Sequence, residues 1–348
     1  MPRSPAGDFS FPISQIRAGL YSDKYFVRSQ TLLKRENHHP QVVMQVFCKK
    51  EALLCGVKEA VACLKRGSPA PRSFKIYALR EGERIKPWET VMHIVGDYTA
   101  FVHLETVYLG ILTRRTSVAT AVRRVVEACG GKPVFFFSAR FDHFLNQAGD
   151  GYAAKIGGVR GVSTDANTRW LRREEAFGTI PHGLIAAYGG NTVKASVVFD
   201  RYMPQSIKRI VLVDFDNDCV RTSLAVARAL GRRLWGVRLD TAKEIRDRSV
   251  KGRGSESFGV SPELVRNVRR ALDQEGYRWV RIIVSGGFDA DRIREFVRRR
   301  APFDAVGIGS AFFHERIEFT ADIVKVNDRP CAKVGRRFRG NSRLKRVG

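Results

Sequence analysis

The sequence lacks the features that mark several large classes of protein. No apolar run reaches the roughly 18 residues that a membrane-spanning helix needs, and residues 1–10 lack the basic-then-apolar layout of a secretory signal. The six cysteines are scattered and form no CxxC pair, so we expect reduced thiols rather than disulfides or a zinc site. These absences predict a cytoplasmic protein that has no membrane span and no structural metal.

Acidic residues are scarce: Asp and Glu number 35 against 61 Lys and Arg, which leaves a formal net charge of +26. Such an excess is typical of proteins that neutralise nucleic-acid phosphates, but a positive field also raises the encounter rate with small anionic substrates. The basic residues spread along the whole chain and are densest over 292–300 and 333–346. Basic runs at helical spacing are usually solvated faces, so we treat nucleic acid as the less favoured partner.

Periodicity divides the chain into two domains. Residues 1–112 are typical of a mixed α/β domain, which segment 318–348 is expected to join as a short hairpin with a basic tail. Helical periodicity covers 51–65 and again 104–128, where we expect two helices broken near 113–117. The runs that predict strands are 42–47, 74–79 and 90–98.

Residues 113–317 form the second domain, in which strands alternate with helices. We expect a helix over 220–230, one that starts at Ser261-Pro262 with the serine as its cap, and one over 289–300. Parallel βα units in series predict an α/β barrel. The apolar runs that predict its strands are 209–214, 234–240, 279–287 and 303–310.

Each of these strands ends in polar or glycine residues. In a βα barrel the carboxyl ends of the strands meet on one face, where active sites are built. A single aspartate after a strand is more often a helix cap, but four such ends together favour a site. The residues at these ends are Asp214; Arg238 and Asp240; Ser285, Gly286 and Gly287; and Gly307, Gly309 and Ser310.

The two glycine loops, SGGFDADRI and GIGS, have a specific chemical use. Without a Cβ, backbone N–H groups can approach an anion closely, and a helix N-terminus adds partial positive charge. The P-loop pattern GxxxxGK[ST] is absent. The loops therefore predict a site for one phosphate monoester.

His182 stands in the irregular segment GTIPHGLI rather than on an apolar helical face. A lone histidine is more often structural than catalytic, and the remaining histidines show no metal-ligand spacing. His182 is therefore a candidate whose role depends on its neighbours in the fold.

In this order the motifs resemble the nicotinate phosphoribosyltransferases, a family of type II phosphoribosyltransferases. The resemblance covers residues 20–347, and the serial order is more specific than any single motif. It implies an irregular α/β barrel with an N-terminal α/β domain, in a homodimer whose active sites lie at the subunit interface. The motifs are YSDKYF, ETVYLGILTRRTSVATAVRR, FFFSAR, IGGVRGVST, GTIPHGLI, LVDFDND, VRLDT, VSGGFD, VGIGS and IVKVNDRPCAKVGR.

The resemblance implies transfer of a ribose 5-phosphate from phosphoribosyl pyrophosphate to nicotinate in NAD biosynthesis. Tyr25, from the partner subunit, and Phe137 would enclose the pyridine ring, because flat ring faces suit a flat heteroaromatic. Arg140 and Arg238 would hold carboxylate or phosphate oxygens through the guanidinium fork.

The remaining roles also come from the resemblance. His182 would be phosphorylated by ATP, and its ordinary pKa near 6.5 would keep the imidazole neutral and nucleophilic. Asp214 and Asp240 would contact the ribose hydroxyls or a Mg²⁺ carried by pyrophosphate. The phosphate groups would lie on Asp23, Thr179, Ser285, Gly286, Gly287, Gly307, Gly309 and Ser310.

Ser163 bears on substrate choice. The related nicotinamide enzymes carry an aspartate at the aligned position, and a serine hydroxyl can instead donate to the carboxylate of nicotinate. The chain departs from the family pattern at Phe141, Arg160, Thr164 and Gly183, which leaves the phosphate contacts open.

Three alternatives remain. One is a related enzyme that uses nicotinamide, or quinolinate, whose second carboxylate needs extra cations. Another is a paralogue that has lost catalysis and binds nucleic acid. The last is a phosphate-binding barrel enzyme of another pathway, which the glycine loops allow but the ordered motifs do not favour.

Overall fold

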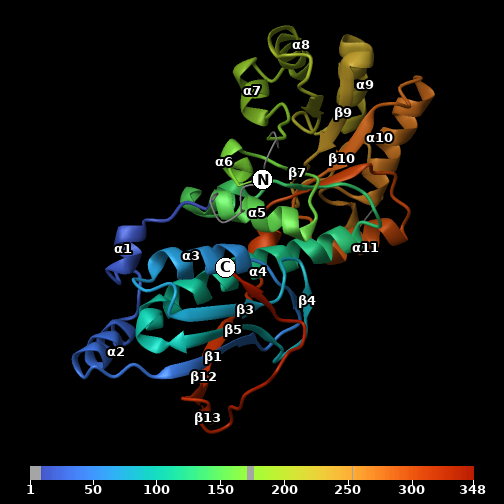
Figure 1. Ribbon diagram of the computed structural model, residues 1–348. Coiled ribbons are helices and arrows are strands. Elements are labelled where there is room, and N and C mark those ends of the chain that lie inside the picture. Colours follow the sequence, from blue (N-terminus) through green and yellow to red (C-terminus); the bar gives the residue numbers. More distant parts are fainter. Residues whose placement is uncertain (1–8, 171–175, 253) are drawn as a thin grey trace. The chain divides into compact units, whose positions relative to one another are not determined.

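The computed structural model describes residues 9–170, 176–252 and 254–348. The segment 1–10, which lacks the layout of a secretory signal, falls mostly in residues 1–8, and these lie outside the described residues. The chain divides into two compact units (Figure 1): residues 1–121 with 315–348, and residues 122–314. Among the described residues, none of the helices combines the length and the apolar character that crossing a bilayer demands.

The first unit is built on a six-stranded antiparallel sheet with the strand order β13-β12-β1-β5-β3-β14. The predicted C-terminal hairpin is confirmed, because β12 and β13 pair across a turn at Asn327 and Asp328, both with positive φ. A small second sheet pairs β2 (Ala52–Leu53) with β4 (Arg84–Ile85). The strands of the large sheet are β1 (Gln41–Cys48), β3 (Phe74–Ala78), β5 (Thr90–Asp97), β12 (Phe319–Val326), β13 (Arg329–Pro330) and β14 (Lys345–Val347).

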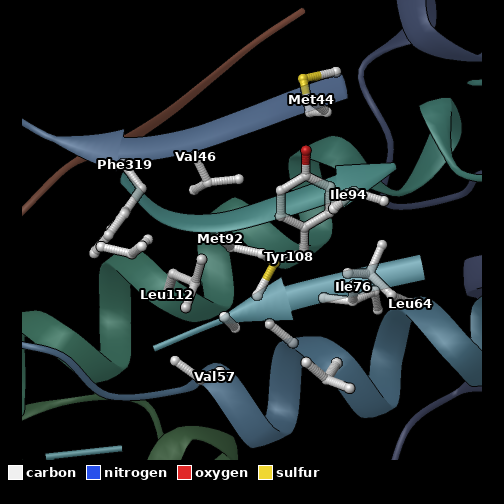
Figure 2. Close-up of a cluster of buried hydrophobic side chains, with 14 of the residues drawn as sticks. Met44, Val46, Val57, Leu64, Ile76, Met92, Ile94, Tyr108, Leu112 and Phe319 are labelled. Atoms are coloured by element: carbon white, nitrogen blue, oxygen red, sulfur yellow. The ribbon is translucent and has the colours of Figure 1, made fainter. Parts of the chain in front are cut away.

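Two helices, α3 (Val57–Gly67) and α4 (Glu105–Ala128), supply apolar side chains to the core of this unit. Figure 2 shows Leu64 from α3 and Tyr108 from α4 against Ile76, Met92 and Ile94 of the sheet, all of them fully buried. Burial of large side chains is the main favourable contribution to folding. Two further helices belong to this unit: α1 (Ile13–Arg17) and α2 (Lys24–Arg35).

The expectation of two helices over 104–128 is wrong, since α4 is continuous. Its hydroxyl residues bond to neighbouring segments instead of breaking the helix. Thr116 Oγ1 donates to the carbonyl of Cys55 and accepts from its N–H, at 2.9 and 3.1 Å. Ser117 Oγ accepts from the N–H of Ile317 at 2.8 Å. These hydroxyls therefore complete the hydrogen bonding of adjacent loops.

The helix expected over 51–65 begins later, at Val57. Residues 52–53 pair with β4 instead, and Gly56 holds a left-handed conformation with φ of 93° directly before the helix. A residue with a Cβ rarely adopts this conformation, so the local chain turns here before the helix can start.

The second unit contains a six-stranded parallel sheet with the order β7-β6-β11-β10-β9-β8. The four predicted strands and the helices between them are present, and Ser261 caps its helix by accepting the N–H of Leu264. The strands are β6 (Val134–Phe136), β7 (Gly161–Val162), β8 (Arg209–Leu212), β9 (Leu234–Leu239), β10 (Arg281–Val284) and β11 (Ala305–Ile308). The helices are α5 (Gln147–Gly157), α6 (Asp165–Thr168), α7 (His182–Ala187), α8 (Thr192–Tyr202), α9 (Cys219–Leu230), α10 (Pro262–Gln274) and α11 (Ala290–Arg298).

Residues 177–180 join the two edges of this sheet. Phe177 N–H donates to the carbonyl of Val162 on β7 at 2.7 Å, and Ile180 N–H donates to the carbonyl of Ile210 on β8 at 2.8 Å. Ile180 also forms an isolated parallel bridge to β8. The segment thus stands where a further strand would, and it closes the sheet into an irregular α/β barrel. The predicted fold class is confirmed.

Candidate functional site

The carboxyl ends of the parallel strands surround two adjoining hollows, of about 420 and 180 Å³. Their shared wall consists of Phe137, Arg140, Arg238 and Asp240. The larger hollow also contains Ser163, Thr179 and His182 in its lining. The fold therefore brings together predicted residues from segments far apart in the sequence.

Glycine and serine residues line the smaller hollow: Ser285, Gly286, Gly287, Gly307, Gly309 and Ser310. Gly286 and Gly287 have φ of 85° and 71°, a conformation that favours glycine. At Gly307 and Gly309 the reason for glycine is different, because neighbouring rings leave no room for a Cβ. A Cβ on them would lie 2.4 Å from the ring of Phe137 and 2.3 Å from that of Phe141. Close ring packing, which the sequence did not reveal, accounts for the second glycine loop alongside any role in anion binding.

Arg238 connects the two hollows. Its Nε donates to Ser285 Oγ at 2.7 Å, its Nη1 donates to Thr179 Oγ1 at 3.3 Å, and its Nη2 lies 3.3 Å from Asp240 Oδ2. Ser285 Oγ in turn donates to Asp240 Oδ1 at 2.7 Å. The guanidinium also lies 4.9 Å from the ring centroid of Phe137. Each member holds the next, so the site is organised without a ligand.

His182 and Asp214 form a pair, with His182 Nε2 2.9 Å from Asp214 Oδ1. The carboxylate is nearly buried, whereas 42% of the imidazole is exposed. This hydrogen bond raises the pKa of His182 above 6.5, against the opposing effect of burial. The expectation of an ordinary pKa is therefore wrong. An ionised carboxylate only accepts, so Nε2 donates to it and Nδ1 is the nitrogen that remains available for chemistry.

Asp214→Asn is expected to lower the pKa of His182, because the carboxylate charge that favours the protonated ring is lost while burial remains. In the native protein the protonated imidazole contributes stability below its unfolded pKa of about 6.5, and this contribution is lost as the pH rises through the higher folded value. NMR titration of the imidazole would measure both values. An unchanged pKa in Asp214→Asn would show that Asp214 does not control the charge of His182.

Asp23 and Tyr25 belong to the first unit, at the start of α2. Asp23 accepts from Thr106 Oγ1 at 2.8 Å and from Tyr25 Oη at 3.3 Å. The Tyr25 side chain is exposed. Its expected insertion into the site of a partner subunit stays a prediction.

Glu105, at the start of α4, lies buried near this pair. Burial, followed by the nearby carboxylates of Asp322 and Asp23, raises its pKa to about 8. Glutamate in an unfolded chain has a pKa of about 4.3. The protonated Glu105 side chain therefore contributes to the stability of the folded protein below the unfolded pKa, and this contribution is lost as the pH rises through the folded pKa of about 8.

Glu105→Gln is expected to remove this pH-dependent loss of stability and to stabilise the protein above pH 8 by up to roughly 5 kcal/mol, since one pKa unit corresponds to about 1.4 kcal/mol. Near pH 4 the two proteins should be equally stable. Urea unfolding across this pH range measures the difference, and a constant difference between the two curves would contradict the raised pKa.

Arg292 is a residue whose role the sequence did not reveal, because it stands within a dense basic run. Its guanidinium donates to the carbonyls of Gly286 and Gly287 at 3.1 and 3.3 Å, and to that of Val260 at 2.9 Å. Burial lowers its pKa. Arg292 thus holds the glycine loop in place through hydrogen bonds to its carbonyls and is not a solvated charge.

The remaining predicted contact, Arg140, is exposed, with its guanidinium 5.2 Å from the ring centroid of Phe141. Among the described residues, no three His, Cys, Asp or Glu side chains come close enough together to hold a metal ion.

Comparisons with known proteins identify relatives of this chain. The family described as quinolinate phosphoribosyl transferase, N-terminal domain, matches residues 23–116. A nicotinate phosphoribosyltransferase of Mycobacterium tuberculosis is 30% identical over 237 residues, which are 66% of this chain and 48% of that protein. One of Bacillus subtilis is 26% identical over 242 residues, 67% of this chain and 44% of that protein. The chain thus spans about half the length of the curated relatives it matches.

Two solved structures extend the likeness over most of the chain. The human nicotinic acid phosphoribosyltransferase, at a TM-score of 0.68 and 17% identity over 89% of this chain and 76% of its own, shares the fold. The nicotinate-nucleotide pyrophosphorylase from Pyrococcus furiosus superposes at a TM-score of 0.83, with 33% identity over all of this chain and 86% of its own. At this identity and coverage the likeness extends beyond the fold, and the chain belongs to the type II phosphoribosyltransferases, the family of the nicotinate phosphoribosyltransferases.

Proposed function

We propose that this chain is a cytoplasmic nicotinate phosphoribosyltransferase, which forms nicotinate mononucleotide and pyrophosphate from nicotinate and phosphoribosyl pyrophosphate in NAD biosynthesis. The network of Arg238, Ser285 and Asp240 is the observation that carries the proposal. It joins a hollow lined by aromatic rings to one lined by glycines. A pyridine and a sugar phosphate that react with each other need two such compartments side by side.

In this proposal the pyridine ring of nicotinate lies against Phe137, which stacks on Phe135 with the rings 13° from parallel. Arg140 and Arg238 attract the carboxylate. The 5-phosphate binds the backbone N–H groups of the glycine loops, where a side chain would interfere. Asp240 then lies beside the ribose, whose anomeric carbon gains positive charge as pyrophosphate leaves, and a fixed carboxylate stabilises that charge.

Mg²⁺ is expected to arrive with the pyrophosphate rather than to reside in the protein. Asp214 and Asp240 are the carboxylates that would hold it, and both already bond to side chains of the site. Mg²⁺ commonly uses one or two protein carboxylates together with substrate phosphates, so these residues fit such an ion. When bound, it would neutralise charge on the leaving group.

The ATP coupling is also a proposal, and it depends on His182. Asp214 fixes Nε2–H and orients the ring, which leaves the Nδ1 lone pair as the phosphate acceptor. Only the neutral ring has that lone pair. The ATP-dependent step should therefore slow as the pH falls through the raised pKa of His182.

We further propose that the chain forms a homodimer. Leu20, Tyr21, Tyr25 and Leu32 are exposed large apolar side chains on and next to α2. A cluster of this kind is typical of a surface that another protein covers. Sedimentation equilibrium would test this: a monomer at micromolar concentration would contradict the homodimer and the placement of Tyr25 in a partner's site.

The substrate is tested by supplying nicotinate, nicotinamide or quinolinate with phosphoribosyl pyrophosphate and Mg²⁺, with and without ATP. We expect nicotinate mononucleotide to form from nicotinate. If quinolinate were the one pyridine that gave a product, the result would favour the related enzyme that uses quinolinate. Ser163 lines the larger hollow. Ser163→Asp should lower kcat/KM for nicotinate at least about tenfold by charge repulsion, whereas Ser163→Ala should have a smaller effect.

A further inference from the structure

A third hollow, of about 620 Å³, lies at the other end of the parallel sheet in the second unit. Its lining comes from the beginnings of strands: Lys208 and Arg209 at β8, Arg232 and Trp235 at β9, and Arg281 at β10. It shares no lining residue with the two hollows at the carboxyl ends. Its size falls in the range of roughly 300–1,000 Å³ that is usual for small-molecule sites.

The charge of this hollow is one-sided. Five of its lining residues are Lys or Arg, and Asp200 is its one acidic residue. Asp200 is already bonded to Arg209 at 2.8 Å and to Arg233 at 2.6 Å. Lys208, Arg232 and Arg281 therefore have no carboxylate partner among the described residues, and all three are exposed. Like charges gathered around one hollow repel one another unless an anion binds between them.

These three cations lie against indole rings. The guanidinium of Arg232 is 3.9 Å from the ring centroid of Trp279, while Lys208 and Arg281 lie 4.7 and 5.0 Å from that of Trp235. The Trp279 Nε1–H is buried without an acceptor among the described residues. A guanidinium that lies over an indole ring, as Arg232 does over Trp279, offers a platform on which a flat base can stack.

We propose that this hollow is a second ligand site, which binds a nucleoside polyphosphate. Its phosphates would lie between Lys208 and Arg281, and its base would stack on the Arg232–Trp279 pair. Free rather than polymeric nucleotide is favoured because one bounded hollow holds all the features, whereas a single strand of nucleic acid needs a groove that continues along its backbone. Binding needs no chemical step and does not depend on the proposed transferase activity.

Aromatic rings separate this site from the candidate active site. Trp235, in the wall of the third hollow, meets Phe177 edge to face with the centroids 6.5 Å apart. Phe177 stacks on Phe135 at 4.0 Å and lines the larger hollow at the carboxyl ends. The barrel interior is therefore filled between the two ends, and the third hollow is a site of its own.

Calorimetry on the full chain with the non-hydrolysable ATP analogue AMP-PNP tests the proposal, and binding at this hollow should add to any binding at the proposed ATP site beside His182. The triple variant Lys208→Gln, Arg232→Gln and Arg281→Gln should weaken binding at this hollow about 100-fold and leave binding beside His182 unchanged, because charged partners of the nucleotide are lost only here. Each single substitution should weaken it less. The matched control removes three exposed arginine charges elsewhere in the same unit, Arg270→Gln, Arg298→Gln and Arg300→Gln, and should bind as the wild type does.

Further probes identify the ligand and the site. Inorganic tripolyphosphate should bind more weakly than AMP-PNP. His182→Ala and Asp240→Asn should retain the binding event that the triple variant weakens, even if the chain proves not to be a transferase. The proposal is overturned by equal binding in the triple variant and its control, or by equal affinity for tripolyphosphate. Binding of a single-stranded oligonucleotide without binding of AMP-PNP would likewise overturn it.

Discussion

Asp240→Asn is expected to reduce kcat/KM for phosphoribosyl transfer by about 10²–10³-fold, the loss typical of removing one fixed electrostatic group from an active site. Asp240 accepts from Ser285 and faces Arg238, so it both positions the shared wall of the two hollows and supplies negative charge beside the ribose. Asparagine keeps the shape and one hydrogen bond but loses that charge.

Asp216→Asn is the matched control, because Asp216 also follows a barrel strand, yet its side chain is 44% exposed. It should leave transfer unchanged. Circular dichroism and thermal unfolding establish that both variants are folded. Transfer at the wild-type rate in folded Asp240→Asn would remove Asp240 from the mechanism, whereas unfolding of that variant would assign it a structural role.

His182→Ala is expected to abolish ATP hydrolysis and the stimulation of transfer by ATP, while slow transfer without ATP persists. The reason is that Nδ1 of His182, oriented by Asp214, is the proposed acceptor of the phosphoryl group. Initial rates with and without ATP, together with acid-labile labelling from γ-³²P-ATP, measure the effect. Equal stimulation by ATP in the variant and the wild type would refute this role.

Two companion variants separate chemistry from position. His182→Gln retains an N–H at the distance of Nε2, which can reach Asp214, but has no nucleophilic nitrogen, so it should behave as His182→Ala does. His38 is exposed, and His38→Ala should retain full stimulation by ATP. Restored stimulation in His182→Gln would show that His182 acts through position alone.

The alternation of apolar runs with glycine and capping residues was sufficient to predict strands β8 to β11 and helices α9 to α11 of the second unit, but not β6, β7 or α5 to α8. Strand ends carry their polar residues in the chain itself, so Asp240 and the Ser285 loop could be assigned to one face from local sequence. Asp214, assigned in the same way, is connected to that face through its bond to His182. Parallel strands with right-handed crossovers leave their carboxyl ends on the same side, and local sequence therefore determines this part of the site.

Tertiary structure alone decided the rest, because those features depend on residues far apart in the chain. The 2.9 Å bond from His182 to Asp214 spans 32 positions and changes the pKa of the imidazole. Closure of the barrel by residues 177–180 depends on two edge strands at once. Arg292, read in the sequence as one charge in a basic run, became a brace only where folding brought the glycine-loop carbonyls to its guanidinium. Sequence patterns report period and propensity, whereas hydrogen-bond partners across the barrel exist only once the chain has closed on itself.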